Sequence, residues 1–109
     1  MTDREVLFQY RLREARETLQ DAKKMTDAGV EARSIVNRAY YAVFYGVLAL
    51  CLRFEIPLKT SKHTGVVSAF DREFVRPERA DVRLSKILHR LFELRQRSDY
   101  RELTVISSE

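Results

Sequence analysis

The segment Ser34–Leu52 reads SIVNRAYYAVFYGVLALCL, and it decides the fold because it is apolar around most of a helix. At about 100° per residue, its few polar side chains fall on one narrow stripe. The stripe consists of Ser34, Asn37, Arg38, Tyr41 and Tyr45. A helix that is apolar on most of its circumference is expected at the centre of a bundle. The polar stripe then either forms a buried network that fixes helix register or lines a site.

The rest of the chain predicts further helices around this central one, because apolar residues recur at helical spacing. The helices are expected over residues 3–26, 31–53, 61–75 and 81–98. Gly29, Pro57 and Pro77 mark the breaks between them, and Asp81 is a suitable N-cap for the last helix. No alternating strand pattern of useful length occurs. We therefore predict an all-α, up-and-down antiparallel bundle of four main helices.

Each flanking helix has an apolar face that predicts its inward side. In the first helix the expected core residues are Phe8, Ala15, Leu19, Ala22 and Met25. In the third they are Val66, Val67, Phe70 and Phe74. In the fourth they are Leu84, Ile87, Leu88, Leu91 and Phe92.

The last residues give a different pattern. Residues 103–106, LTVI, are expected to be extended, and Ser107-Ser108-Glu109 is typical of a helix start. This pattern predicts that the 1–109 domain is C-terminally truncated and lacks a fifth helix. The alternative is a frayed tail.

The length and composition of the chain indicate a single globular domain. A chain of 109 residues has room for one domain, and 45% hydrophobic with 33% charged residues is typical of a globular protein. The net charge of +4 permits an anionic partner without requiring one. The start of the chain has no signal-peptide core, and the uncharged stretch Ala39–Leu52 is shorter than the roughly 18–20 residues that span a bilayer. We expect a soluble, cytoplasmic protein with no membrane contact, in which Cys51 is a small buried side chain.

Two polar side chains are expected on inward faces. Arg95 follows Leu91 by one turn on the fourth helix, and a buried guanidinium needs a partner. Its candidate partners are Asp99 and the tyrosines of the central helix, ahead of Glu93. His63 precedes Val67 by one turn on the third helix. The simpler interpretations are a helix-end salt bridge for the arginine and a packed neutral histidine.

No metal or cofactor is expected. The two histidines, His63 and His89, are separated in the sequence and no cysteine pair accompanies them, so a zinc site is not predicted. Neither a Gly-rich phosphate loop nor a Gly-x-Ser-x-Gly motif occurs.

Three blocks resemble, in order, the second, third and fourth helices of small prokaryotic HEPN domains. They are NRAYYAVF at residues 37–44, HTGVVSAF at 63–70 and FELRQRSDY at 92–100. The resemblance extends from about Val6 to Tyr100. It implies a helical bundle that commonly dimerises. Many HEPN proteins are the toxin of a toxin–antitoxin pair and are encoded beside a minimal nucleotidyltransferase.

The resemblance also implies a test for ribonuclease activity. Catalytic HEPN proteins cleave RNA without metal, using Arg-x(4–6)-His near the end of the helix that corresponds to the fourth helix here. Arg95 matches the arginine, but no histidine follows it, and Asp99 and Tyr100 occupy that region. Arg83 and His89 have the right spacing, but they lie on different faces within the fourth helix.

We therefore expect a noncatalytic HEPN protein of a toxin–antitoxin-type system that binds a nucleotide, an RNA or a nucleotidyltransferase partner and forms a homodimer. The candidate site consists of Arg38, Tyr41, His63, Arg95, Asp99 and Tyr100. Arginines would hold phosphate, and a tyrosine would stack a base. One alternative is a metal-independent ribonuclease that uses His63 with Arg95. Another is a structural dimerisation module, in which the polar stripe only sets register.

Overall fold

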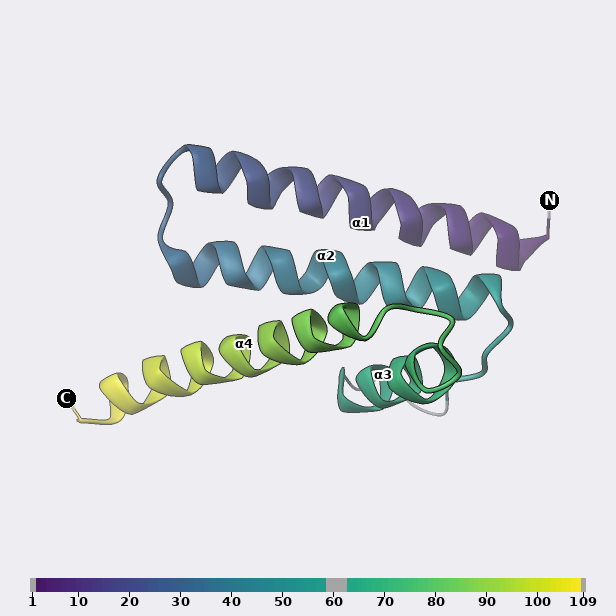
Figure 1. Ribbon diagram of the computed structural model, residues 1–109. Coiled ribbons are helices and arrows are strands. Elements are labelled where there is room, and N and C mark those ends of the chain that lie inside the picture. Colours follow the sequence, from purple (N-terminus) through teal and green to yellow (C-terminus); the bar gives the residue numbers. More distant parts are fainter. Residues whose placement is uncertain (1, 59–62, 109) are drawn as a thin grey trace.

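The computed structural model describes residues 2–58 and 63–108, with side chains described through Arg97, and these residues form only helices and their connections. The elements are α1 (Asp3–Asp27), α2 (Ala32–Arg53), α3 (His63–Phe70), the π-helix η1 (Asp71–Val75) and α4 (Val82–Ser108). The helix α2 lies between α1 on one side and α3 and α4 on the other (Figure 1). The predicted all-α fold with a central second helix is confirmed. Residues 61 and 62 of the expected third helix lie outside the described residues.

Local sequence signals set the helix ends. The Thr2 hydroxyl accepts from the Glu5 backbone N–H at 3.1 Å, and the Glu5 carboxylate accepts from the Thr2 backbone, which is a capping box. Helix α1 ends in a Schellman motif, in which Gly29 takes a φ of 70° that favours glycine. The Asp81 carboxylate accepts from the Arg83 backbone N–H at 2.8 Å and so caps α4, as predicted.

The core lies between α2, α3, η1 and α4. Tyr40, Val66 and Leu88 are its most buried large side chains. The inward face expected for the third helix is confirmed, because its two valines and two phenylalanines are all buried. Cys51 is also buried, and burial raises the pKa of its thiol.

Two predicted inward faces are partly wrong. In α1, Thr18 and Ala22 are buried while Leu19 is 45% exposed, because α2 is the only described helix that α1 packs against and the small residues of α1 face that contact. In α4, Leu88 is buried while Leu84 and Ile87 are each 51% exposed. Only one side of α4 meets other elements of the described chain, so part of its apolar arc remains uncovered.

The expected extended stretch at residues 103–106 is also wrong, because α4 continues as a helix to Ser108. No glycine or proline interrupts this segment, and the threonine, valine and isoleucine in it lower helix propensity only slightly. A four-residue apolar run is too short to distinguish a strand from a helix.

The helix α3 passes directly into η1. The Arg76 backbone N–H donates to the Asp71 carbonyl at 2.9 Å, which is the i→i+5 bond of a π-turn. By length and composition, the 22-residue helix α2 could also cross a membrane. The core helix of a soluble bundle meets the same criteria, and α2 contacts α1, α3 and α4.

Candidate functional site

An aromatic cluster surrounds Tyr40, in the middle of α2. The Tyr40 ring is fully buried. Its ring neighbours, all with centroids within 6 Å, are Tyr41, Phe44, His63 and Phe92. The cluster therefore joins α2 to the first residue of α3 and to the middle of α4.

His63 is held in this cluster by stacking and by one hydrogen bond. Its ring stacks on Phe44 with centroids 4.4 Å apart, and its Nδ1 lies 2.6 Å from the Tyr40 hydroxyl. Burial raises the pKa of Tyr40 to about 12, so the hydroxyl keeps its proton at neutral pH. This residue is fully buried, and Nδ1 is the acceptor available to its hydroxyl among the described residues, so the hydroxyl donates to Nδ1. Burial, and then the charge of Arg95, lower the pKa of His63. The imidazole is therefore neutral at pH 7, with its proton on Nε2.

Arg95 projects from α4 into the same cluster. Its Cζ atom lies 5.3 Å from the ring centroids of both Tyr40 and Tyr41, within the range of cation–π attraction. The predicted inward direction and the predicted tyrosine contacts are both confirmed. Its Nε atom is buried and has no hydrogen-bond partner among the described residues. An unpaired buried donor costs roughly 1–3 kcal/mol, so this N–H is a strong candidate for binding an acceptor.

The structure brings together three of the predicted site residues, namely Tyr41, His63 and Arg95. The rings of Tyr41 and His63 meet edge to face with centroids 5.7 Å apart. Arg38 is exposed on α2, and its charge acts on Tyr45. The side chains of Asp99 and Tyr100 lie outside the described residues.

Sequence reasoning did not include Tyr40 and Phe44 in the site. Both occur in the NRAYYAVF block, but they lie off the polar stripe of α2. The paired tyrosines at positions 40 and 41 were the available signal. One tyrosine of such a pair faces the core when its neighbour lies on a polar stripe, because adjacent residues are about 100° apart.

The far end of the polar stripe is engaged by α1. The Arg11 guanidinium lies 5.9 Å from the Tyr45 ring centroid and donates to Glu14 at 2.8 Å. Burial, and then the charge of Glu14, raise the pKa of Tyr45. This part of the stripe is a network between helices.

The Arg83–His89 pair, whose spacing matches the ribonuclease motif, does not form a joint site. Arg83 pairs with Asp81 at 2.8 Å, whereas His89 Nε2 lies 2.5 Å from the Asp71 carboxylate. The Ser85 hydroxyl donates to the other Asp71 oxygen at 2.6 Å. Burial opposes ionisation of Asp71, but the bonds from Ser85 and His89 lower its pKa overall. Asp71 therefore ties η1 to α4.

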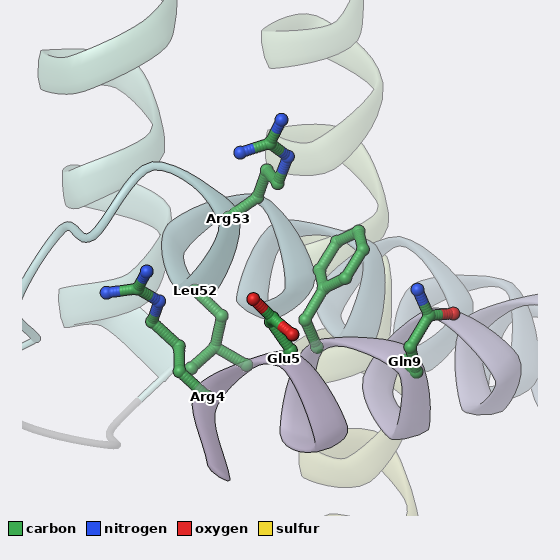
Figure 2. Close-up of a pocket in the computed structure, with 6 residues that line it drawn as sticks. Arg4, Glu5, Gln9, Leu52 and Arg53 are labelled. Atoms are coloured by element: carbon green, nitrogen blue, oxygen red, sulfur yellow. The ribbon is translucent and has the colours of Figure 1, made fainter. Parts of the chain in front are cut away.

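Two surface pockets lie away from the Arg95 cluster and share no residue with it. The larger, of about 340 Å³, lies between the first turns of α1 and the end of α2 (Figure 2). It is lined by Arg4, Glu5, Phe8, Gln9, Leu52 and Arg53. A second pocket of about 230 Å³ is mostly apolar and lies between α1, the last turns of α2 and the segment after α2. Within the described part of the chain, no three His, Cys, Asp or Glu side chains gather as metal ligands would.

The sequence model of the HEPN domain family matches residues 8–109. The chain belongs to the HEPN domain family. The resemblance found in the three sequence blocks is thereby confirmed.

Three related proteins extend this assignment. The chain is 43% identical to a Thermotoga maritima protein named "UPF0332 protein", over all of this chain and 80% of that protein. It is 42% identical over 65 residues to the "Putative toxin MJ0142" of Methanocaldococcus jannaschii, and 35% identical over 68 residues to the "Putative toxin MJ0605" of the same organism. These matches cover 60% and 62% of this HEPN chain, and 43% and 49% of the two relatives. No solved structure matches the chain.

Proposed function

We propose that this HEPN domain is a noncatalytic binding component of a toxin–antitoxin-type system, and that its Arg95 cluster binds the phosphate of a nucleotide or RNA. The observation that carries the proposal is the Arg95 guanidinium, held against two tyrosine rings with a buried Nε that has no partner among the described residues. The names of the two Methanocaldococcus jannaschii relatives, both "Putative toxin", support the toxin–antitoxin context.

The chemistry of the cluster suits an anion. A guanidinium is always charged and presents its donors in a fixed fork that matches phosphate oxygens. The half-buried Tyr41 ring beside it would stack a base. Arg38, exposed on the same helix, would add a second positive charge, and Asp99 and Tyr100 follow Arg95 by about one turn.

The state of His63 supports a noncatalytic role. Metal-free RNA cleavage needs a group that moves protons near neutral pH. The Nδ1 lone pair of His63 accepts from Tyr40, and its Nε2 carries the remaining proton. The imidazole therefore has no free lone pair with which to act as a base, and a neutral imidazole is a weak acid.

A ribonuclease is the second candidate, and one observation favours it. His63 and Arg95 both contact the rings of Tyr40 and Tyr41 within one chain. The ribonuclease alternative requires these two side chains to lie near each other, as they do here. A purely structural module is less well supported, since it requires every polar group of the cluster to be satisfied internally. The Arg95 Nε has no partner in the part of the chain described.

We also propose a cytoplasmic homodimer that associates with a minimal nucleotidyltransferase. Exposed apolar side chains on the first half of α1, namely Val6, Leu7 and Tyr10, are available for a contact between copies. Sedimentation on dilution tests the dimer. Co-purification with a minimal nucleotidyltransferase tests the partner.

The site is tested by titrating ATP and a short single-stranded RNA into the wild type and two variants. Arg95→Ala should weaken binding at least about tenfold, because hydrogen bonds to charged groups contribute about 1.5–3 kcal/mol. Arg97→Ala is the matched control, since this arginine is exposed two residues further along the same helix. Circular dichroism checks that each variant folds. Equal affinities for the two variants would remove the proposed site.

A further inference from the structure

The helix α4 carries an apolar stripe that the rest of the described chain leaves partly uncovered. Its members are Leu84, Ile87, Leu91 and Leu94. Their spacing of three, four and three residues is that of the a and d positions of a coiled coil. Leu84 and Ile87 are the most exposed of the four, and Leu91 and Leu94 are half-buried. We call these residues the α4 stripe.

The α4 stripe lies beside the seam that α4 makes with its own chain. That seam is marked by the buried Leu88, and α4 contacts only α2, α3 and η1 among the described elements. Figure 1 shows α4 beginning beside α2 and slanting away from α2 and α3, and no further described helix lies beyond α4 in this view. The stripe spans roughly 15 Å, at 1.5 Å per residue. Leu84 and Ile87 are its accessible part, because Leu91 also packs against the chain's own core.

One edge of the α4 stripe is a row of arginines. Arg83, Arg90 and Arg97 recur every seven residues, at the g positions that flank a coiled-coil seam, and all three are exposed. The other edge holds Leu88 and Arg95, which face the chain's own core. Charged contacts with a docked helix can therefore form along the arginine edge only.

The arginine edge keeps a positive charge despite its local ion pairs. Arg83 pairs with Asp81 at 2.8 Å, and Glu93 pairs with Arg97 at 2.6 Å and with Arg90 at 3.8 Å. The single Glu93 carboxylate is thus shared by Arg90 and Arg97, so one positive charge of this pair is not neutralised. A second copy of α4 packed antiparallel would bring the two arginine rows together, which is repulsive. In a parallel pair, the arginines of one copy would face Leu88 and Arg95 of the other copy. Those two side chains already pack within their own chain.

We propose that the α4 stripe and its arginine edge are the docking surface for an amphipathic helix of a partner protein, with apolar a and d residues and acidic residues along one flank. Apolar contacts with the stripe supply affinity, and the carboxylates opposite the arginines set orientation and exclude basic helices. This surface takes a protein partner, and the Arg95 cluster is a separate, inward-facing site.

The test uses two synthetic helical peptides of about three heptads, with leucine at every a and d position. One carries glutamate at every e and g position, and the other carries lysine there. Like charges keep each peptide from associating with itself. Fluorescence anisotropy with the full chain should show binding of the glutamate peptide and none of the lysine peptide. Ile87→Ser should weaken binding at least tenfold, and Arg90→Glu should reverse the preference between peptides.

Matched controls lie on α1. Leu19→Ser removes a similarly exposed apolar side chain, and Arg13→Glu reverses an exposed charge there; both should bind the glutamate peptide as the wild type does. Ile87→Ser should also leave ATP and RNA binding unchanged, which separates this surface from the Arg95 site. Equal binding of the two peptides, or equal losses in Ile87→Ser and Leu19→Ser, would overturn the proposal. Self-association of the wild type that Ile87→Ser abolishes would assign the stripe to a second copy instead.

Discussion

The Tyr40 hydroxyl donates a hydrogen bond to Nδ1 of His63 across 2.6 Å, and this bond connects the middle of α2 to the first residue of α3. It also fixes the imidazole tautomer, because the hydroxyl is buried and protonated and has Nδ1 as its acceptor among the described residues. The orientation of α3 and the chemistry of its histidine therefore depend on the same contact.

Replacing the Tyr40 hydroxyl should weaken the fold by a small, measurable amount. Tyr40→Phe keeps the buried ring but removes the hydrogen bond to His63, so we expect the free energy of unfolding to fall by about 0.5–1.5 kcal/mol. Urea denaturation measures this change. Tyr10→Phe, at an exposed position on α1, is the control and should be neutral. Identical midpoints for the two variants would show that the Tyr40 bond contributes nothing.

Stability should decrease as the pH falls through the titration range of His63. Burial and the Arg95 charge lower its pKa from 6.5 in the folded protein, so the unfolded chain binds the proton more readily. This contribution is fully present above about pH 6.5 and is lost as the pH falls from there to the lower folded pKa. Urea titrations between about pH 8 and pH 5 should show the decline in wild type and His89→Gln but not in His63→Gln. Arg95→Gln should raise the pKa of His63, as read from the imidazole resonances by NMR.

Asp71 should stabilise the junction between η1 and α4. Asp71→Asn removes the charge that strengthens its bonds to Ser85 and His89, with an expected loss of about 1–3 kcal/mol. The pKa of Asp71 is lowered in the folded protein, which is the usual direction for a carboxylate that accepts hydrogen bonds. Its contribution is present above the unfolded value of about 3.8 and is lost as the pH falls through the lower folded value. Thermal unfolding of Asp71→Asn should lack this acid decline, whereas Asp21→Asn, exposed on α1, should keep it.

The purified protein should not cleave RNA at a robust rate. Tyr100, Arg101 and Glu102 occupy the positions where the motif would place its histidine after Arg95. His63 is held neutral with its lone pair occupied. Loss of general acid–base help costs typically 10²–10⁴ in rate, so only traces of cleavage are expected. Time courses with labelled RNA and a chelator, on wild type, Arg95→Ala and His63→Ala, measure this. Strong cleavage by the wild type that His63→Ala abolishes would establish the ribonuclease instead.

The sequence predicted the fold well because its strongest signals are local. Helical periodicity, the glycine and proline breaks and the Asp81 cap are all readable without neighbours. Leu19, Leu84 and Ile87 were misplaced because an apolar side chain is buried only where another element covers it. The number of such elements around α1 and α4 depends on the tertiary arrangement.

The candidate site was predictable in part, because the helix face on which a residue lies can also be read from local spacing. Arg95 and His63 were found because each shares a helix face with buried residues. Tyr40 was missed because its role depends on how α2 meets α3 and α4, which helical spacing alone does not determine. Arg38 shares the stripe with Tyr41 but is exposed on α2.

The π-turn of η1 makes the length of this segment a structural constraint. An i→i+5 turn holds one residue more than the α-turn it replaces. Removal of one residue from Asp71–Val75 would rotate the two sides of the turn by about 100° relative to each other. Phe70 and Phe74 could then no longer both face the core while Asp71 reaches Ser85. We therefore expect HEPN relatives with one residue fewer here to anchor α4 through a different carboxylate or to lack this anchor.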